Sequence, residues 1–117
     1  MNRGKPSVEQ HFAGKTPGVR NLYDFLLEAV GKFGEFSEDP KKTSIHFNRR
    51  TAFAGIATRR DAIILTIKAS RDIGSSRILK REQASANRWH HEVRLAKPAD
   101  VDSELISWLK EAYELSA

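Results

Sequence analysis

Apolar residues recur at helical spacing near both ends of the chain. The first stripe lies between residues 17 and 33 and consists of Val19, Leu22, Phe25, Leu26, Ala29, Val30 and Phe33. Thr16 and Pro17 precede it as an N-cap and a proline at the first helical position, where the missing N–H costs nothing. The second stripe follows Asp100 and Asp102, and it consists of Val101, Leu105, Trp108, Leu109 and Ala112, flanked by Ile106 and Tyr113. We therefore predict one helix from Pro17 to Phe33 and another near the C-terminus, capped by Asp100 or Asp102.

The middle of the chain alternates with the period of two that is typical of strands. Ile45 and Phe47 alternate with polar neighbours, residues 52–57 suit a buried strand with small residues, residues 62–69 are rich in β-branched side chains, and residues 88–95 alternate throughout. Residues 77–82 show a weaker pattern. The connections at 49–51 and 58–61 are too short for parallel crossovers, so the first three strands are predicted to form an antiparallel meander.

This order of elements predicts a two-layer α+β fold. An N-terminal helix, an antiparallel sheet of four to five strands and a C-terminal helix would pack with both helices on one face of the sheet. Residues 1–16 are interpreted as a lead-in segment with a short helical turn, in which Ser7 and Gln10 have the spacing of a capping box and Phe12 packs on the body. Residues 17–117 are expected to form a single domain.

The composition excludes several classes of protein. The chain has 117 residues and no cysteine, which rules out disulfide scaffolds, thiolate metal sites and cysteine catalysis. No apolar run approaches the roughly 20 residues of a membrane-spanning helix, and the first residues do not resemble a signal peptide. We expect a soluble, cytoplasmic domain with no membrane partner.

Positive charge is concentrated in the middle of the chain. Residues 41–97 carry a net charge of +10, residues 98–117 carry −4, and the whole chain carries +5. A field of this kind favours anionic partners such as nucleic acid, although cations spread over a solvated surface would give the same count.

Short motifs follow one another between about Val8 and Leu115: His11-Phe12, Leu22-Tyr23, Lys41-Lys42-Thr43, Ile45, Phe47, Phe53-Ala54, His91-Glu92-Val93-Arg94-Leu95 and Leu109-Lys110-Glu111-Ala112-Tyr113. This ordered set, which covers nearly the whole chain, resembles an uncharacterised family, the domain of unknown function 5655. More distantly, a Trp-bearing final strand followed by a helix ending in Tyr resembles the MmcQ/YjbR-like (double-wing, CyaY-like) domains, for which DNA binding has been suggested by fold analogy. The resemblance implies an α+β fold and brings in no catalytic residue.

No pattern in the sequence indicates catalysis or a metal centre. A Gly-x-Ser-x-Gly elbow is absent. His90 and His91 are adjacent on a strand, so their side chains point to opposite faces and cannot chelate one ion together. The inward phase of His91 instead indicates a hydrogen-bonded core or rim histidine. We expect no catalytic residue, no cofactor and no metal, and therefore a protein that is not an enzyme.

The geometry of the meander sorts the cations into groups. The turn after residue 58 lies at the end of the sheet where the first strand begins, which predicts one anion-binding cluster of four side chains: Lys41, Lys42, Arg59 and Arg60. Arg49 and Arg50, with Arg71, would lie at the opposite end of the sheet, about 20 Å away for strands of six residues. Arg88 and Arg94 would share the outer face of the last strand with His90. Such groups can neutralise phosphates without reading base sequence.

Three hypotheses about function follow. The first is a non-enzymatic domain that binds nucleic acid or another anionic partner through the cluster that contains Lys41. The second is a protein-interaction or self-association domain, in which the acidic last helix pairs with the basic sheet edge of another copy. The third is a small-molecule site between the sheet and the C-terminal helix, near Trp89, His91 and Tyr113.

Overall fold

A computed structural model describes residues 6–117, and its elements follow the order expected from the sequence. The 3-10 helix η1 (Glu9–Phe12) leads into the helix α1 (Pro17–Gly31), and a second 3-10 helix, η2 (Pro98–Asp100), leads into the helix α2 (Ser103–Leu115). The strands between them are β1 (Ser37–Pro40), β2 (Ile45–Asn48), β3 (Ala52–Thr58), β4 (Ile63–Ala69), β5 (Ile78–Ser85) and β6 (Arg88–Leu95). The α+β fold is confirmed.

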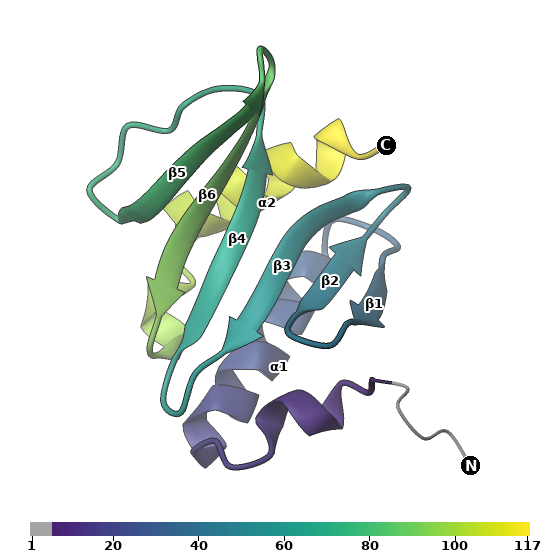
Figure 1. Cartoon of the computed structure of the whole chain (residues 1–117), viewed down its shortest axis with the longest axis vertical. Helices are drawn as coiled ribbons and strands as arrows, with labels where there is room; N and C mark the ends of the chain where they lie inside the picture. Colours follow the sequence, from purple (N-terminus) through teal and green to yellow (C-terminus); the bar gives the residue numbers. More distant parts are fainter. Residues whose placement is uncertain (1–5) are drawn as a thin grey trace.

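The strands form one open antiparallel sheet in the order β1-β2-β3-β4-β6-β5 (Figure 1). The predicted meander corresponds to β2, β3 and β4. The prediction of four to five strands is wrong, because the sheet has six. The additional strand, β1, has the sequence Ser-Glu-Asp-Pro, which lacks β-branched and aromatic residues. It is extended because it pairs with β2 along its length, and Pro40 is tolerated because β1 is an edge strand.

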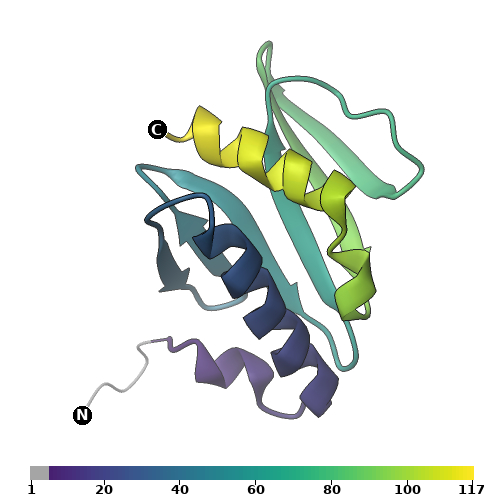
Figure 2. The ribbon, with the colours of Figure 1, turned by 180° about the vertical axis from the view of Figure 1, so that it is seen from behind.

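Both helices pack on one face of the sheet, as the sequence predicts (Figures 1 and 2). Leu22 and Leu26 of α1 and Leu105 and Leu109 of α2 are fully buried against it. No helix of residues 6–117 covers the other face (Figures 1 and 2). None of the helices among residues 6–117 is long and apolar enough to cross a membrane.

Two details of α1 differ from its predicted stripe. Phe25 is 44% exposed, whereas Tyr23 is fully buried and donates a hydrogen bond to Glu38. The helix therefore presents a slightly rotated face to the sheet, because Tyr23 can bury its ring against Phe12 and Phe47 while its hydroxyl keeps a partner. The helix ends at Gly31 rather than at Phe33.

The lead-in segment is held to the sheet by hydrogen bonds. The capping box is confirmed, since Ser7 N–H donates to Gln10 Oε1 at 3.1 Å and Gln10 N–H donates to Ser7 Oγ at 3.3 Å. The ring of Phe12 packs on Tyr23 with centroids 5.0 Å apart, also as predicted. His11 Nε2 donates to the carbonyl oxygen of Lys41 at 2.8 Å. Residues 1–5, the remainder of the predicted lead-in, lie outside the described residues.

Candidate functional site

The structure places Lys41, Lys42, Arg59 and Arg60 at the same end of the sheet. Ile45 pairs with Ile56 in antiparallel register, so the turn before β2 and the turn after β3 lie at the same end of the sheet. His11 joins them, because it binds Lys41 through its ring while its carbonyl oxygen accepts a hydrogen bond from Thr58. A hollow of about 170 Å³ beside this end of the sheet is lined by Pro6, Gln10, His11, Lys41 and Lys42.

The partners of these four cations differ. Lys41 Nζ lies 2.9 Å from Asp39 Oδ2, and this ion pair holds the pKa of Asp39 below its ordinary value of 3.8. Among residues 6–117, Lys42, Arg59 and Arg60 have no carboxylate within ion-pair distance. All four side chains are exposed to solvent.

Arg49 and Arg50 lie at the opposite end of β3, against the C-terminus of α2. Arg49 Nη1 donates to the carbonyl oxygen of Tyr113 at 3.1 Å, and the backbone N–H of Arg50 donates to the carbonyl oxygen of Ser116 at 3.1 Å. A cation at this position satisfies carbonyl groups that the last turn of a helix leaves unpaired. Arg49 therefore has a structural role.

Part of the charge asymmetry along the sequence is neutralised within the fold. Arg77 Nη1 lies 2.9 Å from Asp102 Oδ1, and Arg71 Nη2 lies 3.5 Å from Glu111 Oε2. These pairs join the basic middle of the chain to its acidic C-terminal segment. Asp102 and Glu111, two of the acidic groups that the self-association hypothesis requires, are thus engaged inside their own chain.

Trp89, His91 and Tyr113 do not converge on a common cavity in the structure. Trp89 and His91 stack with ring centroids 6.0 Å apart, whereas the hydroxyl of Tyr113 donates to the carbonyl oxygen of Glu35 at 2.8 Å and its ring packs on Phe53. None of the three side chains lines either of the two hollows described in this section.

His91 is a core histidine, as its phase on the strand indicates. It is fully buried, and its Nε2 lies 3.1 Å from the N–H of Ile73 and 3.1 Å from Asp72 Oδ1. Nε2 accepts from Ile73 in one tautomer and donates to Asp72 in the other. Together with Arg81, whose Nε lies 2.9 Å from Asp72 Oδ1, it holds the loop between β4 and β5 on the sheet. These two bonds lower the pKa of Asp72, with that of His91 as the larger cause.

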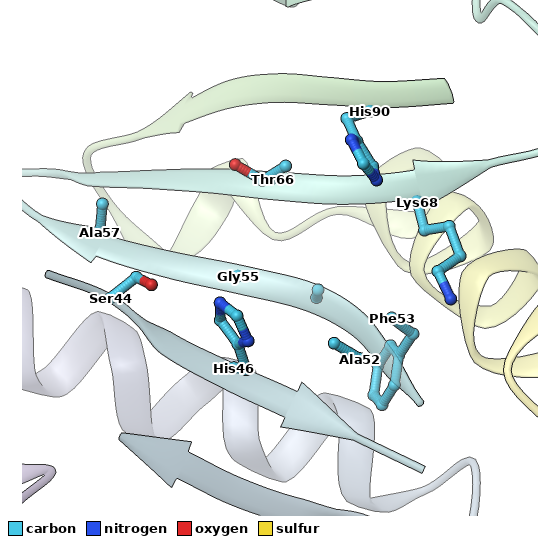
Figure 3. Close-up of a pocket in the computed structure, with 10 residues that line it drawn as sticks. Ser44, His46, Ala52, Phe53, Gly55, Ala57, Thr66, Lys68 and His90 are labelled. Carbon is cyan, nitrogen blue, oxygen red and sulfur yellow. The ribbon is translucent and has the colours of Figure 1, made fainter. Parts of the chain in front are cut away.

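The larger hollow lies on the open face of the sheet (Figure 3). It has a volume of about 270 Å³, and its lining comes from β2, β3, β4, β6 and the residue before β2: Ser44, His46, Ala52, Phe53, Ala54, Gly55, Ala57, Thr66, Lys68 and His90. We call this hollow the open-face groove. Ala52, Gly55 and Ala57 contribute little or no side chain above β3, so the middle of the sheet is low, while longer side chains on the neighbouring strands stand above it.

Cross-strand pairing fixes the positions of the polar lining. His46 is opposite Gly55, and Gly55 is opposite Thr66, so the three form one row across β2, β3 and β4. Lys68, two residues after Thr66 on β4, is opposite His90 on β6. His46 and His90 are three strand spacings apart, roughly 14 Å, and therefore bound opposite sides of the groove. Figure 3 shows both imidazole rings standing above the sheet.

Lys68 is the most unusual charged group in the open-face groove. Its Nζ donates to Thr51 Oγ1 at 3.1 Å and to Ser116 Oγ at 3.0 Å, and among the described residues it has no carboxylate partner. Burial lowers the pKa of this ammonium, and the nearby positive charge of Arg88 lowers it further.

The sequence pattern did not identify this groove. Every polar lining residue on a strand occupies the outward phase, but His90 joins the others only because β6 inserts next to β4 and leaves β5 at the edge. The small residues within 52–57 suggest a buried strand, and they equally suit the floor of a hollow. That run of small side chains is the one signal that points to the site.

Comparison with known proteins identifies the family of this chain. Residues 8–116, nearly the whole chain, match the family described as Domain of unknown function (DUF5655). The chain belongs to this family. The description of DUF5655 assigns no activity, and no curated protein and no solved structure matches the chain. Any function of this DUF5655 domain must therefore be argued from its own surface.

Proposed function

We propose that this domain is a non-enzymatic binding module that holds a small anionic molecule in the open-face groove. The observation that carries the proposal is the chemistry of the lining, which offers one lysine, two histidines and two hydroxyl groups and contains no acidic residue. Lys68 is central, because a partly desolvated ammonium without a carboxylate partner gains most from an incoming negative group.

The shape of the groove limits the size of the ligand. Its volume of about 270 Å³ lies just below the usual range of small-molecule sites, roughly 300–1,000 Å³. A compact molecule fits, with its apolar part over Gly55 and Ala57 and its negative group beside Lys68 and His90. Thr66, between these two ends, offers a hydroxyl that can donate or accept a hydrogen bond.

Titration with inorganic phosphate, followed by amide NMR shifts at low ionic strength, tests this proposal. We expect the shifts to centre on Gly55, Thr66 and Lys68 and to disappear in Lys68→Met. Lys110→Met is the matched control, because it removes one positive charge from the exposed surface of α2, away from the groove, and should leave the shifts intact. Shifts that survive in Lys68→Met, or that are lost equally in both variants, would show that phosphate is attracted only by net charge.

A second candidate is binding of nucleic acid at the sheet end that carries Lys41, Lys42, Arg59 and Arg60. It is favoured by the absence of ion-pair partners for the last three among residues 6–117 and by the hollow beside Lys42. Binding of a labelled duplex that weakens steeply with added salt, and that Lys42→Gln and Arg60→Gln reduce, would support it. No binding at about 50 mM salt would exclude it.

A further inference from the structure

The surroundings of Lys68 satisfy what a neutral amine needs. A neutral amine has two N–H groups and one lone pair, and Nζ has two hydroxyl oxygens at donor distance, Thr51 Oγ1 and Ser116 Oγ. When both hydroxyls accept, the lone pair is the remaining tetrahedral position. Lys68 lines the open-face groove, so this amine is in reach of a bound molecule.

Burial and the positive charge of Arg88 both oppose protonation of Lys68. On β6 it is faced by His90, directly opposite in the register, and by Arg88 and Glu92, the two diagonal neighbours. On β2, across the groove, the titratable group is His46. Among the described residues, Glu92 is not part of the groove lining and lies beyond ion-pair distance of Lys68. Desolvation and a neighbouring cation are the two ways in which proteins make a lysine nucleophilic at neutral pH, and both lower the pKa of Lys68, with desolvation as the larger cause.

We propose that Lys68 is a nucleophilic amine that binds a small anionic aldehyde in the open-face groove covalently and reversibly, as a Schiff base. This inference rests on the proposed function, because the negative group of the ligand is what brings the aldehyde to the groove. Arg88 is the positive group beside Lys68 that remains available to a carboxylate or phosphate after the lysine has reacted.

The reaction balances without an oxidant or a reductant. The lone pair of Nζ attacks the carbonyl carbon, the C–N bond forms, and the electrons of the C=O π bond move to oxygen, which takes one proton from nitrogen. The resulting carbinolamine loses its hydroxyl group as water and its remaining N–H proton, leaving a C=N bond. The groove is open to solvent, so water carries these protons, and hydrolysis releases the aldehyde by the reverse steps.

Reductive trapping with glyoxylate and cyanoborohydride tests the assignment. Glyoxylate carries both an aldehyde and a carboxylate, and reduction of its Schiff base leaves a stable carboxymethyl group on the lysine. Peptide mapping of the intact protein at pH 7 should find several-fold more label on Lys68 than on Lys80, an exposed lysine of β5 on the same face of the sheet. This preference should narrow as the pH rises, because the other lysines then also become free amines. Equal or lower labelling of Lys68 would overturn the inference.

Two measurements on the wild-type protein separate this inference from the proposed function. Phosphate binding tests the groove as an anion site, whereas glyoxylate trapping tests whether Lys68 forms the covalent bond. If wild-type protein binds phosphate in the groove and traps no glyoxylate at Lys68, the covalent step is wrong and the proposed function stands. If neither phosphate binding nor trapping occurs in the groove, both are wrong.

Discussion

The guanidinium carbon of Arg49 lies 4.1 Å from the centre of the Tyr113 ring, and Arg49 Nη1 donates to the carbonyl oxygen of the same tyrosine at 3.1 Å. One side chain from the β2–β3 turn thus contacts both the ring and the backbone of the last turn of α2. Tyr113 in turn donates to the carbonyl oxygen of Glu35, ahead of β1. This short chain of contacts joins three segments that are distant in sequence.

Arg49→Met should lower the free energy of unfolding by about 1–2 kcal/mol, since it removes a cation–π contact and a charged hydrogen bond. Urea denaturation measures the change. Arg50→Met is the control, because Arg50 contacts Ser116 through its backbone N–H, which methionine keeps, and it should change stability by less than about 0.5 kcal/mol. Equal effects of the two variants would contradict a structural role for the Arg49 side chain.

Gly34→Ala should destabilise the fold by at least about 2 kcal/mol. Gly34 has a φ of +144°, and a Cβ there would lie 2.5 Å from the hydroxyl oxygen of Tyr113. Gly31→Ala is the opposite case, because Gly31 ends α1 with open space around it, and it should stabilise by about 0.5–1 kcal/mol. Thermal melts of the two variants should therefore shift in opposite directions, and a shared direction would show that the close approach of Tyr113 to Gly34 is not tight.

Acid should weaken the fold partly through Asp102, which caps α2. The N–H of Leu105, and after it Arg77, hold the pKa of Asp102 below its ordinary value of 3.8. A carboxyl whose pKa is lower in the folded state stabilises the fold at pH values above the unfolded pKa, and this contribution is lost as the pH falls through the folded pKa. Asp102→Asn keeps a capping oxygen and cannot titrate, so the urea midpoint of this variant should fall less between pH 6 and pH 3 than that of the wild type. Parallel pH profiles would contradict this role.

Gly55→Val should separate binding from stability. A Cβ at Gly55 would lie 3.8 Å from His46 Cδ2 and 3.9 Å from Thr66 Cβ, which are ordinary contacts, and valine favours strands. We expect stability to stay the same or rise by up to about 1 kcal/mol, while the phosphate-induced amide shifts are lost because the side chain fills the floor of the groove. Retained shifts in a folded Gly55→Val protein would place the ligand elsewhere.

The sequence determined the parts of this protein that depend on local periodicity. The stripe from Val19 to Val30, the alternation of residues 88–95 and the cap at Asp102 each reflect interactions within a few residues, so helices, strands and the antiparallel meander could be predicted. The inward phase of His91 likewise indicated its burial. The end of the sheet that Lys42 and Arg60 share also followed from the sequence, because only short turns separate the strands involved.

The tertiary structure alone decided where the polar outward residues meet. Strand β1 exists only because β2 offers it a pairing edge, and the groove includes His90 only because β6 lies beside β4, which sets His90 opposite Lys68. Such pairings depend on contacts between residues that are far apart in the chain, and no local pattern specifies which strands become neighbours. The ammonium of Lys68 acquires its unusual surroundings in the same way, since Thr51, Ser116 and Arg88 reach it from three separate segments.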